Sequence, residues 1–132
     1  MLHINQNVID ALIQHAIKDA PIEACGYLAE KNGTIAVHFP LRNVDASADH
    51  FSLDPKEQFD SVRAIRSEGM KLVAVYHSHP ASPARPSQED IKLAFDPNLS
   101  YVIVSLDGGQ PVVKSFRIQK GNVEEEVFVI EQ

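Results

Sequence analysis

The segment from Tyr76 to Asp90, with the sequence YHSHPASPARPSQED, contains the residues of this chain that are best suited to chemistry. It places His77, His79 and Asp90 close together along the chain, with Ser87 between the histidines and the aspartate. Imidazole nitrogens and carboxylate oxygens are preferred zinc ligands, and a catalytic zinc takes three protein ligands and keeps a fourth position for water. We therefore predict a metal site with His77, His79 and Asp90 as its ligands.

The same residues also have ordinary structural interpretations. A His-x-His pair occurs by chance, and Ser87 with Asp90 matches the S-x-x-D capping box that begins a helix. The two interpretations are compatible, because a fixed first turn of a helix also fixes the direction in which Asp90 points. Pro80, Pro83 and Pro86 stiffen the loop further and lower the entropy that is lost when it becomes ordered.

A metal-activated water also needs a nearby group that takes its proton and returns it to a leaving amine. Spacing alone does not choose among the candidate glutamates, which are Glu23, Glu30, Glu57, Glu68 and Glu89. Glu23 is favoured because its segment, PIEACGY, lies between a predicted helix and a predicted strand, where polar side chains can face a cleft. Cys25 follows two residues later, and we interpret it as a packing residue; a nucleophile, a fourth metal ligand and a redox sensor are the alternatives.

Hydrophobic patterns predict the helices that surround these residues. Apolar residues at helical spacing indicate a helix over about residues 8–17, with Asn5 or Asn7 as its cap and Pro21 as its stop. A second helix is predicted from Pro55 to Ser67. Asp54 caps it, and the glutamate at its third position completes a box-like signal. A third, short helical pattern follows Ser87, with Ile91, Ala94 and Phe95 on one side.

Strand-like runs complete the predicted fold. They cover residues 25–29, 34–39, 72–76, 101–106, 112–118 and 123–130, with a possible short strand over 50–53. The pair Asn32-Gly33 supplies a tight hairpin turn between the first two. The run over 72–76 leads directly into the histidines, and the twofold repeat of strand side chains points His77 and His79 to one face. The tail is expected to be antiparallel. The whole pattern predicts a mixed α/β fold: a curved, mostly antiparallel central sheet with about three helices packed around it, in one domain over residues 1–132.

Composition narrows the class of protein. The chain has 132 residues and a formal charge of -6, so it has no basic footprint for nucleic acid or an anionic membrane. The single cysteine excludes an intrachain disulfide and suits a reducing compartment. The first residues, MLHINQN, have neither a basic region nor an apolar signal core, and no apolar run approaches membrane-spanning length. We therefore expect a cytoplasmic protein.

The motifs together resemble the JAMM/MPN+ zinc metalloprotease family. The pattern of that family is a glutamate, a long gap, H-[ST]-H-P, a serine and then an aspartate, at set spacings. Every position of the pattern is filled in this chain: Glu23, which is followed by ACG, then the HSHP segment that begins at His77 and contains His79, then Ser87 and Asp90. The resemblance implies one zinc ion per chain on His77, His79 and Asp90. It also implies that Glu23 is the general acid/base and that Ser87 stabilises the oxyanion of the tetrahedral intermediate.

The resemblance also implies a substrate. The chain looks like the small prokaryotic members that process sulfur carriers, which predicts cleavage of a peptide, isopeptide or amide bond after the C-terminal Gly-Gly of a small β-grasp, ubiquitin-like or sulfur-carrier protein. Glycine suits a narrow cleft, because a chain without side chains can pass through it. The alternatives are a noncatalytic MPN-type binding module and a zinc hydrolase of other small peptide or amide substrates.

Overall fold

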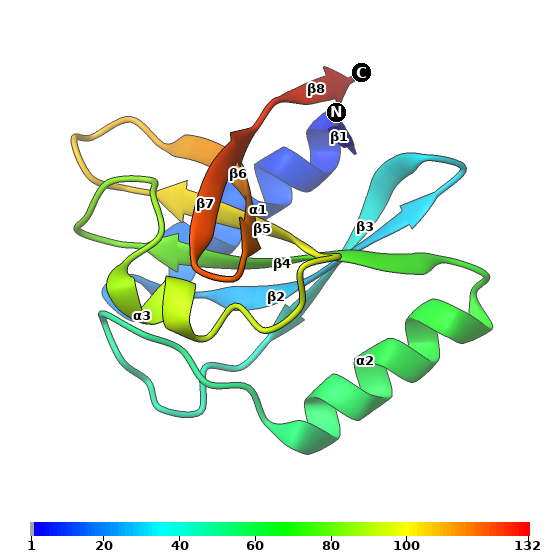
Figure 1. Ribbon diagram of the computed structural model, residues 1–132, viewed down its shortest axis with the longest axis horizontal. Helices are drawn as coiled ribbons and strands as arrows, with labels where there is room; N and C mark the ends of the chain where they lie inside the picture. Colours follow the sequence, from blue (N-terminus) through cyan, green and yellow to red (C-terminus); the bar gives the residue numbers. More distant parts are fainter. Residues whose placement is uncertain (1) are drawn as a thin grey trace.

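The computed structural model describes residues 2–132 and consists of one eight-stranded sheet with three helices (Figure 1). The strands are β1 (Leu2–Asn5), β2 (Cys25–Lys31), β3 (Thr34–Leu41), β4 (Lys71–His79), β5 (Ser100–Ser105), β6 (Val112–Gln119), β7 (Asn122–Glu126) and β8 (Phe128–Glu131). The helices are α1 (Gln6–Asp19), α2 (Pro55–Ser67) and α3 (Gln88–Lys92). The strand order is β7-β6-β5-β4-β2-β3-β1-β8, and four of the seven neighbouring pairs are antiparallel. The predicted mixed α/β class is confirmed.

Strand β4 lies near the middle of this sheet, between β2 and β5. It runs antiparallel to β2 and parallel to β5. Parallel neighbours need a long crossover connection, because the chain must return to the end of the sheet where the first strand began before it can run in the same direction again. Residues 80–99, which include α3, form that crossover. The predicted ligand loop is therefore the segment that carries the chain from the end of β4 back to the start of β5.

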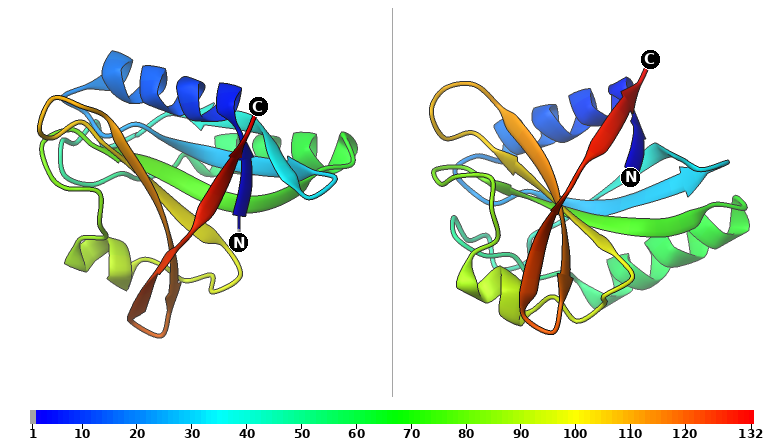
Figure 2. Two further views of the ribbon diagram at one scale, coloured as in Figure 1. Left: turned by 90° about the horizontal axis from the view of Figure 1, so that it is seen from above. Right: turned by 45° about the horizontal axis from the view of Figure 1, so that its top comes forward.

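The helices cover opposite faces of the sheet (Figure 2). Helix α1 packs its apolar side, including Leu12 and Ala16, against a cluster that contains Tyr76. Helix α2 packs Ile65 against the cluster that contains Val75. Side chains alternate along a strand, so His77 and His79 share the face of Val75. The sequence of β4 thus directs both histidines away from α1 and toward the side where α2 lies.

A third apolar cluster fixes the position of α3. Ile91 at the end of the helix and Ala94 just after it pack against Ile103 of β5 and Ile118 of β6. Contrary to the predicted apolar side, Phe95 does not join them, because the residue is 81% exposed. The helix ends at Lys92, so Phe95 no longer follows helical spacing.

Several expected elements differ from the structure at their ends. The predicted last strand over 123–130 divides into β7 and β8 at Val127, and β8 pairs in parallel with β1. The expectation of a wholly antiparallel tail is therefore wrong. The possible strand over 50–53 is also absent among the described residues, where only Leu53 forms an isolated bridge, with Asn43.

The predicted caps are largely present. Asn5 is the N-cap of α1, although its side chain makes no capping hydrogen bond. Asp54 caps α2 by accepting a hydrogen bond from the Lys56 amide, whereas Glu57 accepts from the Arg42 amide and completes no box. No helix within residues 2–132 combines the length and the apolar character that crossing a bilayer would require.

Candidate metal centre

The end of β4 and the start of α3 bring three predicted ligands together. The Nε2 atoms of His77 and His79 lie 3.1 Å apart, and each lies 3.1 Å from Oδ2 of Asp90. All three side chains are largely buried. In a tetrahedral zinc site with bonds of about 2.0–2.1 Å, ligand atoms are about 3.3 Å apart. The donor types and their spacing therefore fit a single small cation.

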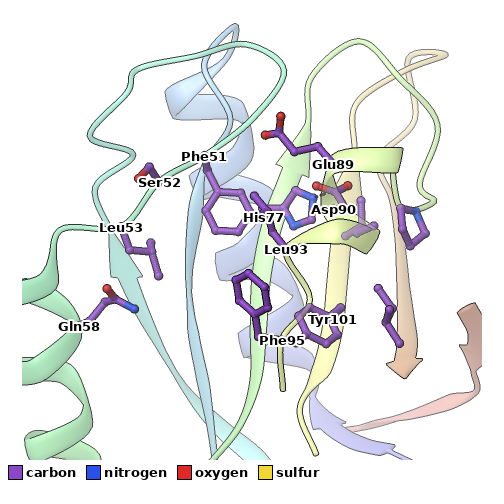
Figure 3. A pocket seen from close by; sticks show the side chains of 13 residues that line it. Phe51, Ser52, Leu53, Gln58, His77, Glu89, Asp90, Leu93, Phe95 and Tyr101 are labelled. Carbon is purple, nitrogen blue, oxygen red and sulfur yellow. Dashed lines mark hydrogen bonds and ion pairs between the residues drawn. The ribbon is translucent and has the colours of Figure 1, made fainter. Parts of the chain in front are cut away.

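The contacts around the histidines hold their rings in place. Nδ1 of His79 lies 2.8 Å from the carbonyl oxygen of Pro83. A carbonyl oxygen only accepts, so Nδ1 carries a proton and Nε2 is the ring nitrogen that is left to bind a metal. The ring of Phe51 stacks on the ring of His77 with centroids 4.9 Å apart and an interplanar angle of 28° (Figure 3). Neither the Pro83 carbonyl nor Phe51 was predicted as part of the site.

Ser87 and Asp90 form the predicted capping box and also serve the site. The Ser87 hydroxyl oxygen accepts from the Asp90 amide at 3.0 Å, and Oδ2 of Asp90 accepts from the Ser87 amide at 2.9 Å. Burial opposes ionisation of Asp90, but hydrogen bonds with His77, His79 and the Ser87 amide hold its pKa well below the ordinary range. The carboxylate is thus charged and fixed by the helix start, as a ligand must be.

Glu23 reaches this site through the pairing of β2 with β4. Cys25 is opposite His77, and the backbone groups of Ala24 bond to Ser78: the Ser78 amide donates to the Ala24 carbonyl at 2.9 Å. Continuing this register places Glu23 opposite His79, and alternation puts both side chains on one face. The extension of the β2–β4 ladder therefore brings a remote carboxylate beside the ligands.

One oxygen of the Glu23 carboxyl group is buried without a hydrogen-bond partner among the described residues. The residue is 2% exposed, and this oxygen is Oε1. Burial raises the pKa of Glu23 to about 8, partly offset by attraction to His79 and reinforced by repulsion from Asp90. An orphaned buried carboxyl beside three convergent donors is a typical arrangement at a reactive centre.

The other candidate glutamates are distributed differently. Glu89 precedes Asp90 on α3 and lines the neighbouring pocket, whereas Glu57 is engaged with the Arg42 amide. Glu30 pairs with Lys71 at the opposite end of β4 from the histidines, and Glu68 follows the end of α2. Among these five residues, the structure thus gives Glu23 the buried position across from the ligands.

An open pocket of about 320 Å³ adjoins the ligands (Figure 3). His77 and Asp90 form part of its wall. The remaining lining is mainly apolar and comes from Phe51, Leu53, Pro86, Leu93, Phe95, Tyr101, Ile103 and Ile118, with Ser52, Gln58 and Glu89 as polar members. The pocket lies between the segment that precedes α2 and helix α3, so its apolar walls adjoin the ligand set.

Two further residues of the motifs have structural explanations. A Cβ atom on Gly26 would lie 2.4 Å from the Phe39 carbonyl oxygen and 2.6 Å from the Tyr76 ring, so the glycine of the EACG segment is required by close packing. Cys25 is fully buried in the cluster with Val75, and burial raises the pKa of its thiol to about 12. A thiol in this state packs and does not act as a nucleophile.

Residues 5–119 match the family model described as prokaryotic homologs of the JAB domain. The CysO-cysteine peptidase of Mycobacterium tuberculosis is 40% identical, with 100% of this chain and 93% of that protein aligned. A probable TtuB-protein conjugate cleaving protease of Thermus thermophilus is 34% identical over 92% and 78% of the two chains. A desampylase of Haloferax volcanii is 38% identical over 75% and 76%.

Solved structures show the same fold. A protein from Desulfitobacterium hafniense has a TM-score of 0.90 at 42% identity, covering 100% of this chain and 94% of its own. A JAB1/MPN domain protein from Archaeoglobus fulgidus has a TM-score of 0.68 at 22% identity, covering 98% and 97%. The second likeness extends to the fold alone.

Proposed function

This chain belongs to the prokaryotic homologs of the JAB domain, small members of the JAMM/MPN family, and from that premise we propose that it is a zinc-dependent hydrolase. The proposed reaction is cleavage of a peptide, isopeptide or amide bond after the C-terminal Gly-Gly of a small ubiquitin-like or sulfur-carrier protein. One observation carries the proposal: the three donor atoms of His77, His79 and Asp90 converge beside the orphaned carboxyl of Glu23. We take residues 1–132 as one catalytic domain that works in the cytoplasm.

The proposed ligands are His77, His79 and Asp90, with one zinc ion per chain. Bound there, zinc would supply Lewis acidity, which polarises a carbonyl group and lowers the pKa of water. The fixed tautomer of His79 and the capped position of Asp90 present their lone pairs without further rearrangement.

Glu23 is proposed as the group that moves the proton. It takes a proton from the attacking water and gives it to the nitrogen of the leaving amine as the carbon–nitrogen bond breaks. A pKa of about 8 suits both roles, since a carboxyl group that titrates near neutral pH can accept and release a proton with little cost.

Ser87 is proposed as the donor to the oxyanion. Its oxygen accepts the Asp90 amide hydrogen through a lone pair, which leaves the hydroxyl hydrogen available to donate. One such donor typically contributes about 3 kcal/mol to transition-state stabilisation.

The relatives support the proposed substrate class. The names of those at 40% and 34% identity describe cleavage of CysO-cysteine and of TtuB-protein conjugates. A small carrier with a cysteine attached after Gly-Gly is therefore the first substrate to test, followed by a carrier with a longer C-terminal extension. The apolar pocket beside the ligands offers room for the carrier's tail.

The test is a screen by intact mass. Zinc-loaded wild type is incubated with Gly-Gly-tailed carriers that bear either a terminal cysteine or an extension, with Glu23→Gln as the matched inactive control. Release of the group after the second glycine by wild type only is the expected result. No mass change with any carrier would reject this substrate class, and full activity of Glu23→Gln would reject the role of Glu23.

A further inference from the structure

Asn43 lies in the irregular loop between β3 and α2, and it is buried with 7% exposure. Its side-chain amide nitrogen donates toward three backbone carbonyls: Glu23 at 3.1 Å, His50 at 2.9 Å and Ser47 at 3.4 Å. An asparagine has two N–H donors, so these hydrogens are shared among the three oxygens. The amide nitrogen of Asn43, the donor half of the side chain, thus connects the backbone of Glu23 with the loop backbone at Ser47 and His50.

The acceptor half of Asn43 binds a different segment. Its Oδ1 atom accepts from the amides of Asp45 and Ser52, each at 3.2 Å. Ser52 lies between Phe51, which stacks on the ring of His77, and Leu53, and all three line the pocket. One side chain therefore contacts both the acid/base segment and the pocket wall.

Other bonds of the loop support the same connection. The Glu23 amide donates to the Ser47 carbonyl at 2.9 Å, and the Val44 amide donates to the Ser52 carbonyl at 3.0 Å. Within residues 2–132, the hydrogen bonds of Asn43 do not reach the proposed ligands. An effect of Asn43 on the reaction can therefore be separated from an effect on metal binding.

We propose that Asn43 is a positioning residue: its amide nitrogen fixes Glu23 relative to the ligand set, and its amide oxygen fixes the pocket wall at Phe51–Leu53. The inference rests on the proposed function, in which Glu23 moves the proton. Displacement of a reacting group by about 1 Å can lower the rate about 100-fold. A buried asparagine with both halves engaged is suited to prevent such a displacement.

Two variants separate the halves of the side chain. Asn43→Asp keeps an acceptor for the Ser52 amide and loses the donor to Glu23, whereas Asn43→Ala loses both. We expect kcat to fall about 10- to 100-fold in both variants, and KM to rise only in Asn43→Ala, with zinc content unchanged. Ser100→Ala is the control, because Ser100 is also buried and hydrogen-bonded, to Glu126, but lies in β5 opposite Ala74. Its kcat should equal that of wild type.

Hydrogen exchange tests the positioning without any substrate. In zinc-loaded Asn43→Ala, the amides of Glu23 and Ser52 should exchange at least about tenfold faster than in wild type, while β4 stays protected. Three results would each overturn the inference. They are unchanged exchange at these two amides, unchanged kcat in both Asn43 variants when wild type is active, and an equal loss of kcat in Ser100→Ala. A wild type that cleaves no carrier would instead reject the proposed function, and the exchange rates would still decide whether Asn43 holds the segment.

Discussion

The hydroxyl oxygen of Ser78 accepts a hydrogen bond of 2.7 Å from the backbone amide of Ala24. Ser78 stands between the two proposed histidine ligands, and Ala24 follows Glu23, so this bond joins the two halves of the site across 54 residues of sequence. It extends the β2–β4 ladder by a side-chain contact at the point where the carboxyl group and the ligands meet.

Removal of that hydroxyl should therefore weaken both the fold and the reaction. Ser78→Ala leaves the buried Ala24 amide without a partner, which should lower the free energy of unfolding by about 1–3 kcal/mol and reduce kcat. Denaturant unfolding and steady-state kinetics provide the measurements. Ser78→Thr is the control, because it keeps the hydroxyl; a Thr variant as impaired as the Ala variant would contradict this explanation.

Glu23 should make the stability of the metal-free protein depend on pH. Its folded pKa of about 8 exceeds the ordinary value of 4.5, so its stabilising contribution is complete below pH 4.5 and is lost as pH rises toward 8. Glutamine at this position does not titrate, so the unfolding free energy of Glu23→Gln should not show this loss. Between pH 5 and pH 8, the unfolding free energy of the variant minus that of wild type should therefore rise by roughly 2–4 kcal/mol. Denaturant unfolding of both proteins in the presence of a metal chelator, at pH 5 and at pH 8, measures this difference. The exposed Glu68→Gln serves as control, and an equal difference at pH 5 and pH 8 for Glu23→Gln would refute the expectation.

Zinc should stabilise the folded chain through the proposed ligands. At a free zinc concentration about 1,000 times the Kd, the expected gain in unfolding free energy is about 4 kcal/mol, and chelation should abolish it. His77→Ala should show no gain, whereas His3→Ala, which removes a partner of Glu131 in the β1–β8 pair, should retain it. Thermal unfolding with and without zinc measures the effect. A zinc content under about a tenth per chain in wild type would favour a noncatalytic binding module.

The two functions of Ser87 can be separated by substitution. Ser87→Ala loses the helix cap and the proposed oxyanion donor, so kcat should fall about 100-fold and stability by about 1 kcal/mol. Ser87→Asp keeps a capping acceptor and lacks the hydroxyl hydrogen, so it should retain stability and still lose kcat. Recovery of kcat in Ser87→Asp would show that capping alone explains the residue.

Phe95 should affect the binding of substrate and leave the fold unchanged. It lines the pocket with a largely exposed ring, so Phe95→Ala should change stability by less than about 0.5 kcal/mol. Loss of about 1 kcal/mol of apolar contact would raise KM about fivefold. Phe59→Ala is the matched control, since Phe59 is 62% exposed on α2 and does not line this pocket. Equal KM values for the two variants would argue against a role for Phe95.

Local patterns were sufficient to predict most elements and the ligand segment. The twofold repeat of β4 predicted that His77 and His79 share a face, and the S-x-x-D spacing predicted the capping box at Ser87 and Asp90. The strand β1 was missed because four residues that run directly into α1 carry too little alternation to be distinguished from the helix start. Its pairing with β8 was missed for the same reason.

Contacts between remote segments could not be predicted from local patterns. The burial of Glu23 depends on the register of β2 against β4, and the packing of Phe51 on His77 depends on an irregular loop. Asn43 lies in an irregular loop, so no helical or strand periodicity marks it in the sequence. Its five hydrogen-bond partners are backbone groups, and only the folded loop defines their positions. Spacing alone left five candidate glutamates; the position of Glu23 between a predicted helix and a predicted strand favoured it, and the family pattern supplied its proposed role.

The crossover between β4 and β5 also has a consequence for the order of folding. Asp90 takes its place only when α3 packs Ile91 onto β5 and β6, whereas His77 and His79 are positioned as soon as β4 forms. Any partly folded state in which β2, β3 and β4 are paired but α3 is not yet packed would thus hold two of the three ligands and retain zinc weakly. Tight metal uptake would then require the packing of α3 against β5 and β6, so the rate of zinc capture during refolding would report when the crossover between β4 and β5 closes.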